Sequence, residues 1–128
     1  MTGEHSDIPV LDVVQAHFEA FNTGDVNALM AGFADDAVFA TGDHIVVGNR
    51  GIRAMFTDAL RSLSPTLALR AAVVQGEVVA CELSETIRVD GGAMEFALAA
   101  FYTVRRGQIV RVKVYREGSA EAPGGTPA

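Results

Sequence analysis

The sequence predicts one α+β domain, in which a curved mixed or antiparallel sheet wraps around three helices. Apolar residues recur at helical spacing through most of the chain before Pro65, and after Pro65 they alternate with a period of two. Helical segments followed by a long run of strands are typical of α+β folds. A length of 128 residues, with 49% hydrophobic and 20% charged residues, suits a single globular domain.

Three helices are expected, each with recognisable ends. The first begins after Asp7, a good N-cap, and ends where Gly24 suits a left-handed C-cap. Asp25 caps a short second helix, and a third helix spans about residues 50–63 and stops before Pro65. The residues predicted to form their buried faces are Val10, Val13, Val14, His17, Phe18, Phe21, Leu29, Met30, Phe33, Ile52, Met55, Phe56 and Leu60.

Six strands are expected, and turn residues separate most of them. They span residues 37–41, 44–48, 66–75, 78–90, 93–105 and 108–116. Gly42-Asp43 is expected to form a tight hairpin turn between the first two, and Asp35-Asp36 to lie in a loop after the second helix. Alternation assigns to the inner face of the fourth strand Cys81, Leu83, Glu85, Ile87 and Val89. On the fifth strand it places on one face Met94, Phe96, Leu98, Ala100, Tyr102 and Val104, and on the sixth Val110, Val112, Val114 and Arg116.

Composition excludes several classes of function. A net charge of −6 argues against a nucleic-acid partner, and the single cysteine, Cys81, can form no intramolecular disulfide. The start of the chain does not read as a signal peptide, and no apolar stretch is long enough to cross a membrane, so a cytoplasmic protein is expected. We expect a flexible N-terminus at residues 1–7, the domain at residues 8–117 and a disordered tail at residues 118–128.

Three segments carry a resemblance to a known family. VVQAHFEAFNTGDVNALMAGFADDAVF at residues 13–39, GNRGIRAMF at residues 48–56 and GQIVRVKVYR at residues 107–116 resemble the nuclear transport factor 2-like superfamily. That group includes SnoaL-like polyketide cyclases, ketosteroid isomerases, limonene-epoxide hydrolases and scytalone dehydratases. The resemblance implies a cone-shaped sheet, a SnoaL-like α+β barrel, around a mostly apolar pocket, and its concave side would place Tyr102 and Arg116 on the same side as Glu85. It says little about activity, because these members share a scaffold and differ in their site residues.

The active site of the ketosteroid isomerases is not retained. By resemblance, their tyrosine on the first helix falls at His17, their catalytic base at Thr41 and their protonated aspartate near Ala100. Steroid isomerisation by that mechanism is therefore not expected. The arginine-bridged pair of aspartates of the epoxide hydrolases is not found either.

Glu85 is the polar residue that interrupts the predicted inner face of its strand. An unpaired ionised carboxylate in an apolar interior costs several kcal/mol, so Glu85 must be protonated, paired or wetted by a cavity. Burial can raise the pKa of such a group into the range that a general acid or base needs. The alternative is a structural glutamate that forms a salt bridge at a strand end or reaches water.

Four further residues are candidates for catalysis. His17 could pair with Glu85 across the pocket, each shifting the pKa of the other, or be an ordinary core histidine. Tyr102 could donate to an oxyanion or only pack in the core. Arg116, if inward, would pair with Glu85 or hold an anionic group; otherwise it is solvated. Asp43 is also explained by its turn. The expected substrate-binding wall comprises Phe21, Phe39, Thr41, Met55, Phe56, Leu83, Phe96, Leu98, Val112 and Val114.

Two classes of function remain open. The first is an enzyme without cofactor or metal, an isomerase, cyclase, dehydratase or epoxide hydrolase that applies general acid–base chemistry to a small apolar, polyketide- or terpenoid-like molecule. The second is a non-catalytic ligand-binding or dimerisation module. The outer sheet face is expected to carry Ala68, Ala72, Val74, Ala97, Ala99, Phe101 and Tyr115. Small and aromatic groups on an exposed face suggest a partner, and the resemblance implies a homodimer.

Overall fold

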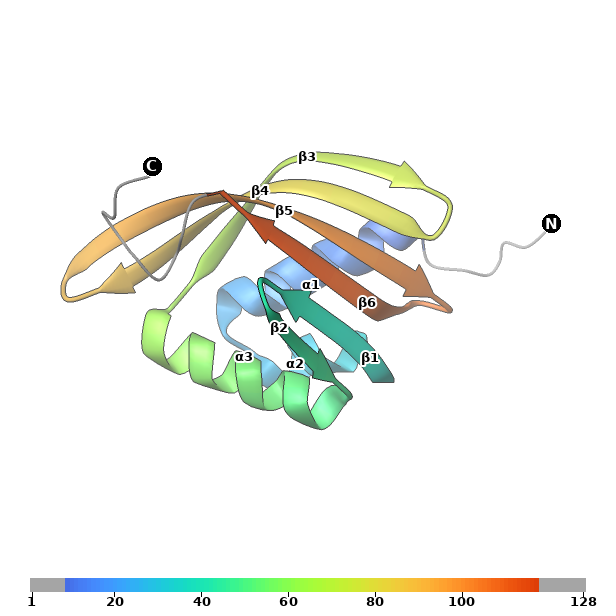
Figure 1. Ribbon diagram of the computed structural model, residues 1–128, viewed down its shortest axis with the longest axis horizontal. Helices are drawn as coiled ribbons and strands as arrows, with labels where there is room; N and C mark the ends of the chain where they lie inside the picture. Colours follow the sequence, from blue (N-terminus) through green and yellow to red (C-terminus); the bar gives the residue numbers. More distant parts are fainter. Residues whose placement is uncertain (1–8, 118–128) are drawn as a thin grey trace.

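The computed structural model describes residues 9–117, which form an α+β fold with three helices on one side of a curved sheet (Figure 1). In chain order the elements are α1 (Val10–Thr23), α2 (Val26–Ala31), β1 (Phe33–Thr41), β2 (His44–Val47), α3 (Asn49–Leu63), β3 (Thr66–Gln75), β4 (Val78–Val89), β5 (Gly92–Arg105) and β6 (Gln108–Arg116). The predicted fold class is confirmed. The predicted start of the first helix after Asp7 is wrong: Pro9 is extended, with a ψ of 138°, and is itself the N-cap of α1. The predicted flexible N-terminus at residues 1–7 and the predicted tail at residues 118–128 lie outside the described residues.

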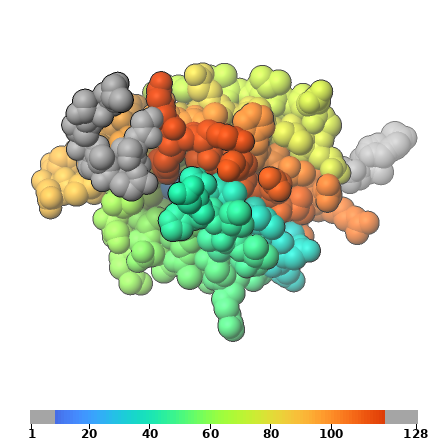
Figure 2. All heavy atoms as spheres, viewed as in Figure 1, coloured from blue at the N-terminus to red at the C-terminus, as the bar shows by residue number. Residues whose placement is uncertain are grey.

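The sheet is mixed because its two parts join through one parallel pair. Its strand order is β2-β1-β6-β5-β4-β3, and β1 runs parallel to β6 while all other neighbours are antiparallel. In Figure 2 the teal β1–β2 hairpin packs directly against the red strand β6. The β3–β6 meander therefore continues into the hairpin, and the sheet curves around the helices without closing.

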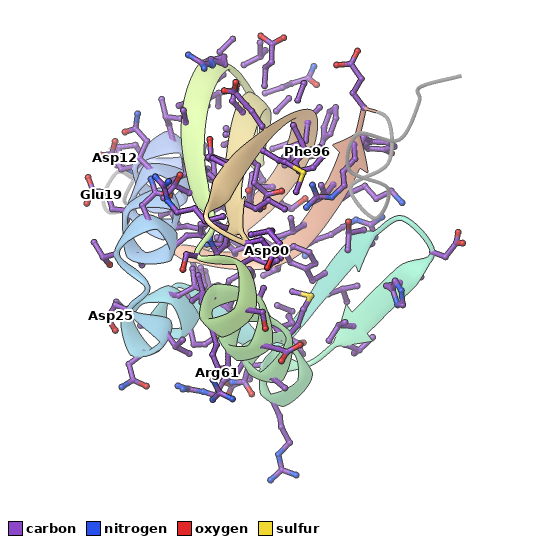
Figure 3. The ribbon with its side chains drawn as sticks, turned by 90° about the vertical axis from the view of Figure 1, so that its left-hand side faces the viewer. Asp12, Glu19, Asp25, Arg61, Asp90 and Phe96 are labelled. Carbon is purple, nitrogen blue, oxygen red and sulfur yellow. The ribbon has the colours of Figure 1, made fainter. Side chains whose placement is uncertain are left out.

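Each helix covers the sheet with one apolar face. On α1, Val13, Val14, His17, Phe18 and Phe21 are buried, whereas Asp12 and Glu19 point outward (Figure 3). Gly24 ends α1 with a φ of +75°, the left-handed cap that its sequence predicts. None of the helices within residues 9–117 is long and apolar enough to cross a membrane.

A side chain near the end of α1 fixes the edge of the sheet. Nδ2 of Asn22 donates to the carbonyl oxygen of Leu67 at 2.9 Å, and the amide of Leu67 donates to Oδ1 of Asn22 at 2.7 Å. Since β3 is an edge strand, its outer backbone groups lack a neighbouring strand. The amide of Asn22 takes that place at Leu67 and holds α1 against β3.

The Asp35-Asp36 pair was expected in a loop, and that expectation is wrong. β1 already begins at Phe33, so both aspartates lie in the strand, where the register against β6 shifts between Phe33 and Val38. The irregular stretch leaves both aspartates exposed. Oδ1 of Asp35 accepts a hydrogen bond of 2.9 Å from Nδ2 of Asn49 and so ties β1 to the start of α3.

Two register shifts change which residues face inward. Between Leu69 and Ala71 the pairing of β3 with β4 shifts, so that Ala72 pairs with buried Cys81, and Ala72 packs against the core. Ala72 and Val74, which were predicted on the outer face, therefore lie on the inner side. Ala71 and Val73 lie on the outer face instead. In β6, Ile109 pairs with Val104 and is fully buried, while Val110 occupies the shift.

Candidate functional site

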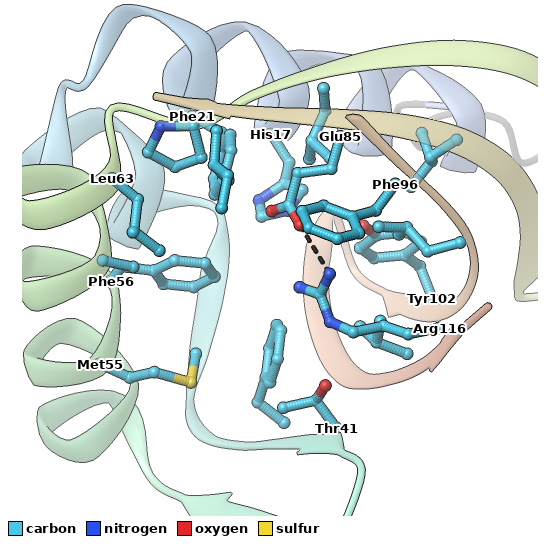
Figure 4. A pocket seen from close by; sticks show the side chains of 18 residues that line it. His17, Phe21, Thr41, Met55, Phe56, Leu63, Glu85, Phe96, Tyr102 and Arg116 are labelled. Carbon is cyan, nitrogen blue, oxygen red and sulfur yellow. Dashed lines mark hydrogen bonds and ion pairs between the residues drawn. The ribbon is translucent and has the colours of Figure 1, made fainter. Parts of the chain in front are cut away.

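A cavity of about 310 Å³ lies between the helices and the inner face of the sheet (Figure 4). It matches the lower end of the range for small-molecule sites and would hold about ten water molecules at roughly 30 Å³ each. Its lining side chains are His17, Phe21, Phe39, Thr41, Met55, Phe56, Ala59, Leu63, Pro65, Leu67, Leu83, Glu85, Ile87, Phe96, Leu98, Tyr102, Val114 and Arg116. Most of these are apolar, and the polar groups come from α1, β1 and three adjacent strands.

Glu85 and Arg116 form an ion pair in the wall of this cavity. Nη1 of Arg116 lies 2.7 Å from Oε1 of Glu85, the contact dashed in Figure 4. The pair reaches across β5, because Glu85 is opposite Phe96 and Arg116 is opposite Leu98. Glu85 is 9% exposed, and the side chain of Arg116 is 30% exposed. Both side chains line the cavity. Of the states expected for Glu85, protonated, paired or wetted by a cavity, the structure shows the paired one.

His17 is buried in an aromatic cage. Its ring packs against those of Phe18, Phe33, Phe56 and Tyr102, and its Nδ1 has no hydrogen-bond partner among the described residues. Burial lowers the pKa of His17 to about 4, so the imidazole is neutral at pH 7. The hypothesis that His17 and Glu85 shift the pKa of each other is not supported, because burial alone accounts for His17 and the partner of Glu85 is Arg116.

Tyr102 presents a neutral hydroxyl. The residue is 2% exposed, and burial, with smaller electrostatic contributions from Cys81 and Glu85, raises the pKa of Tyr102 above its usual range. The phenol therefore keeps its proton at neutral pH. Burial also raises the pKa of the Cys81 thiol to about 11, so this thiol stays protonated and has no nucleophilic character at neutral pH.

Two predicted site residues lie away from the cavity lining. Asp43 is exposed in the Gly42-Asp43 turn between β1 and β2, and Val112 is fully buried in the core. Five lining residues were not predicted: Ala59, Leu63, Pro65, Leu67 and Ile87. Ile87 was already on the predicted inner face, and Ala59 lies one helical turn after Met55, so both carried a usable signal. Leu63 to Leu67 form the junction between α3 and β3, whose path the periodicity does not describe.

A metal site is not formed by the part of the chain that the structure describes. Among residues 9–117, no three His, Cys, Asp or Glu side chains lie close enough together to hold a metal ion. The expectation of a cofactor-free protein stays a prediction.

The fold is shared with several solved structures. An LEH-like epoxide hydrolase from M. tuberculosis superposes with a TM-score of 0.79 at 17% identity, over 84% of this chain and 82% of that one. TerC, co-crystallised with polyporic acid, gives a TM-score of 0.78 at 18% identity, over 86% and 92% of the two chains. A polyketide cyclase candidate from Sinorhizobium meliloti gives a TM-score of 0.71 at 22% identity, over 84% of this chain and 100% of that one. At these identities the likeness establishes the fold and not an activity.

The sequence itself identifies the family. No curated protein matches the chain. The family model of the SnoaL-like domain, in contrast, matches residues 14–112, which include α2, α3, β1 to β5 and all the polar cavity residues except Arg116. With the cone-shaped sheet and its internal cavity, this match shows that the chain belongs to the SnoaL-like domain family.

Proposed function

We propose that this protein is a cofactor-independent enzyme that applies general acid–base chemistry to a small, largely apolar molecule of polyketide or terpenoid type. The observation that carries the proposal is the carboxylate of Glu85 in the wall of a mostly apolar cavity, held by Arg116. Carboxylates in such surroundings are costly to bury, and they concentrate at functional sites. The epoxide hydrolase and cyclase candidate that share the fold support a reaction of this general kind.

In this proposal Glu85 moves the proton. A carboxylate with one oxygen bonded to Arg116 is fixed in orientation and keeps its other oxygen for a substrate proton. Arg116 stabilises the negative charge before the transfer. The same arrangement suits isomerisation, cyclisation, dehydration or epoxide opening, because each of these reactions includes a proton transfer.

His17 and Tyr102 would stabilise charge that develops on a substrate oxygen. The hydroxyl of Tyr102 is protonated and can donate a hydrogen bond. The neutral imidazole of His17 carries one N–H, and we assign it to Nε2, since a bare lone pair at the unpartnered Nδ1 costs less than a buried N–H without an acceptor. Two neutral donors at this end of the cavity favour an oxyanion without adding a formal charge.

Replacement of Glu85 tests this proposal. Glu85→Gln should abolish turnover and leave ligand affinity largely intact, because the shape is kept and the base is lost. Suitable probes are 2-tetralone, whose exchange of α-protons with deuterated water is followed by NMR, and styrene oxide, whose opening is followed by chromatography. The matched control is Glu82→Gln, on the same strand but exposed on the outer face. Turnover that is unchanged in Glu85→Gln would refute the role of Glu85. Binding of a probe without any product from the wild-type protein would instead support a non-catalytic ligand carrier.

We also propose that the protein forms a homodimer through the outer face of the sheet. The row Val73, Ala80 and Phe101 crosses β3, β4 and β5 in register, and Tyr115 packs edge-on against Phe101 with 5.9 Å between the ring centroids. Val73, Phe101 and Tyr115 are 67%, 44% and 54% exposed. A contiguous apolar patch of this kind is typical of an association surface. The cytoplasmic location stays a prediction.

A further inference from the structure

We infer that the ligand of this cavity is an amphipathic acid, with a small aromatic or alicyclic body inside and a carboxylate or ionised enol bound by Arg116. This inference rests on the proposed role of the cavity as a ligand site and specifies the class of ligand. It follows from the unequal accessibility of the two charges in the wall, from the donors of Arg116 that no residue within 9–117 takes up, and from the position of Arg116 in the sheet.

The accessible charge of the cavity is positive. Glu85 is 9% exposed and already has its partner, whereas the side chain of Arg116 is 30% exposed. The other lining residues carry no formal charge at neutral pH, because burial keeps His17 and Tyr102 neutral. The charge of an entering ligand therefore meets the more exposed cation of Arg116, whereas the charge of Glu85 is already balanced by its ion pair. A cationic ligand would have to displace Arg116 from Glu85 first.

Arg116 has donors to spare. A guanidinium carries five N–H donors in a planar fork, and only Nη1 is engaged by Glu85. No other carboxylate within residues 9–117 forms an ion pair with Arg116. Figure 4 shows the guanidinium between Glu85 and Thr41, facing the open space of the cavity. A planar pair of ligand oxygens matches the remaining edge of the fork, which is the geometry in which arginine binds carboxylates most strongly.

The position of Arg116 in the sheet favours an acid over a neutral polar ligand. Arg116 is the last residue of β6, opposite Leu98, and Thr41 ends the neighbouring strand β1. An anionic group there stays partly hydrated, which avoids most of the cost of burying a charge. The ligand body would then lie against the aromatic side chains of Phe21, Phe39 and Phe56.

Two probes of nearly equal shape test the inference. Naphthalene-2-carboxylate and 2-acetylnaphthalene share a ring system and differ in charge, and isothermal calorimetry at neutral pH and low salt measures both. The wild-type protein should bind the carboxylate at least about tenfold more tightly, a factor that corresponds to roughly 1.4 kcal/mol. Arg116→Gln should remove that preference, and Arg111→Gln, on the same strand but exposed, should retain it.

A second variant keeps the test decisive if Arg116→Gln does not fold. Glu85→Gln retains Arg116 and removes the carboxylate that competes for it. This variant should therefore bind the carboxylate probe at least as tightly as the wild-type protein does. Equal affinity for the two probes, or binding of neither, in the wild-type protein overturns the inference. Tighter binding of the carboxylate probe without any turnover that depends on Glu85 would support the inference and refute the proposed enzyme. Turnover that depends on Glu85 without tighter binding of the carboxylate probe would support the enzyme and refute the inference.

Discussion

The ring of His17 packs against the ring of Tyr102, with 5.4 Å between the centroids and 60° between the planes. His17 is 5% exposed and is surrounded by aromatic rings, so its protonation would place an unpaired charge in the core. This is why burial lowers the pKa of His17 to about 4. The free energy of unfolding therefore depends on pH through the protonation of His17.

Replacement of His17 should flatten the acid side of the stability profile. An unfolded histidine titrates near 6.5, so between about pH 6.5 and pH 4 the unfolded chain binds a proton that the folded chain does not. The free energy of unfolding should therefore fall as the pH falls through this window, by up to about 1.4 kcal/mol per pH unit from this group. Urea titrations of wild type and His17→Phe across the window give the difference profile.

The control for this prediction is His44, which is exposed on β2. His44→Gln should change the profile less than His17→Phe, because the His44 side chain stays in contact with water in the folded chain. A His17→Phe profile that runs parallel to the wild-type profile would show that His17 titrates alike in the folded and unfolded chains and would contradict the lowered pKa of His17.

Alternation and turn residues account for what the sequence predicted well. The period of two placed Glu85 on the inner face of its strand, because alternation along an uninterrupted strand decides which residues share a face. The family resemblance then placed Arg116 on the same side as Glu85. Alternation failed at Ala72 and Ile109, since a register shift of one residue reverses the parity beyond it. Parity also could not decide between an ion pair and a solvated Arg116. That depends on how β5 sets the distance between β4 and β6, a property of the assembled sheet.

Asn22 should be important for stability although its side chain is exposed. Asn22→Ala removes both hydrogen bonds to the backbone of Leu67 and should lower the free energy of unfolding by about 1–3 kcal/mol, even though alanine is the better helix former. The amide of Leu67 should also exchange faster with solvent, as measured by NMR. Asn27→Ala is the matched control, because Asn27 is exposed on α2 and bonds no described residue through its side chain. Equal effects of the two changes would contradict the role of Asn22 as a clamp.

Gly51 allows α3 to approach β2 closely. A Cβ at this position would lie 2.8 Å from Cγ1 of Val46, a distance that real side chains essentially never show. In an open helix, Gly→Ala gains about 0.5–1 kcal/mol, but valine is stiff and cannot easily yield. Gly51→Ala should therefore destabilise the wild-type protein and stabilise the Val46→Ala variant. Chemical denaturation of the four proteins measures this coupling, and the same gain in both backgrounds would rule out the close contact.

The outer-face dimer predicts a charge-sensitive association. In a two-fold dimer the same patch meets itself, so one substitution acts twice across the interface. Phe101→Glu would place carboxylates beside the row of Val73 and Ala80 in both copies, and should convert a dimer into a monomer in sedimentation velocity. Ile45→Glu is the matched control: Ile45 is 69% exposed, but it lies on the edge strand β2, which β1, β6 and β5 separate from β4. A wild-type monomer, or a dimer broken equally by both changes, would show that the outer face is not the interface.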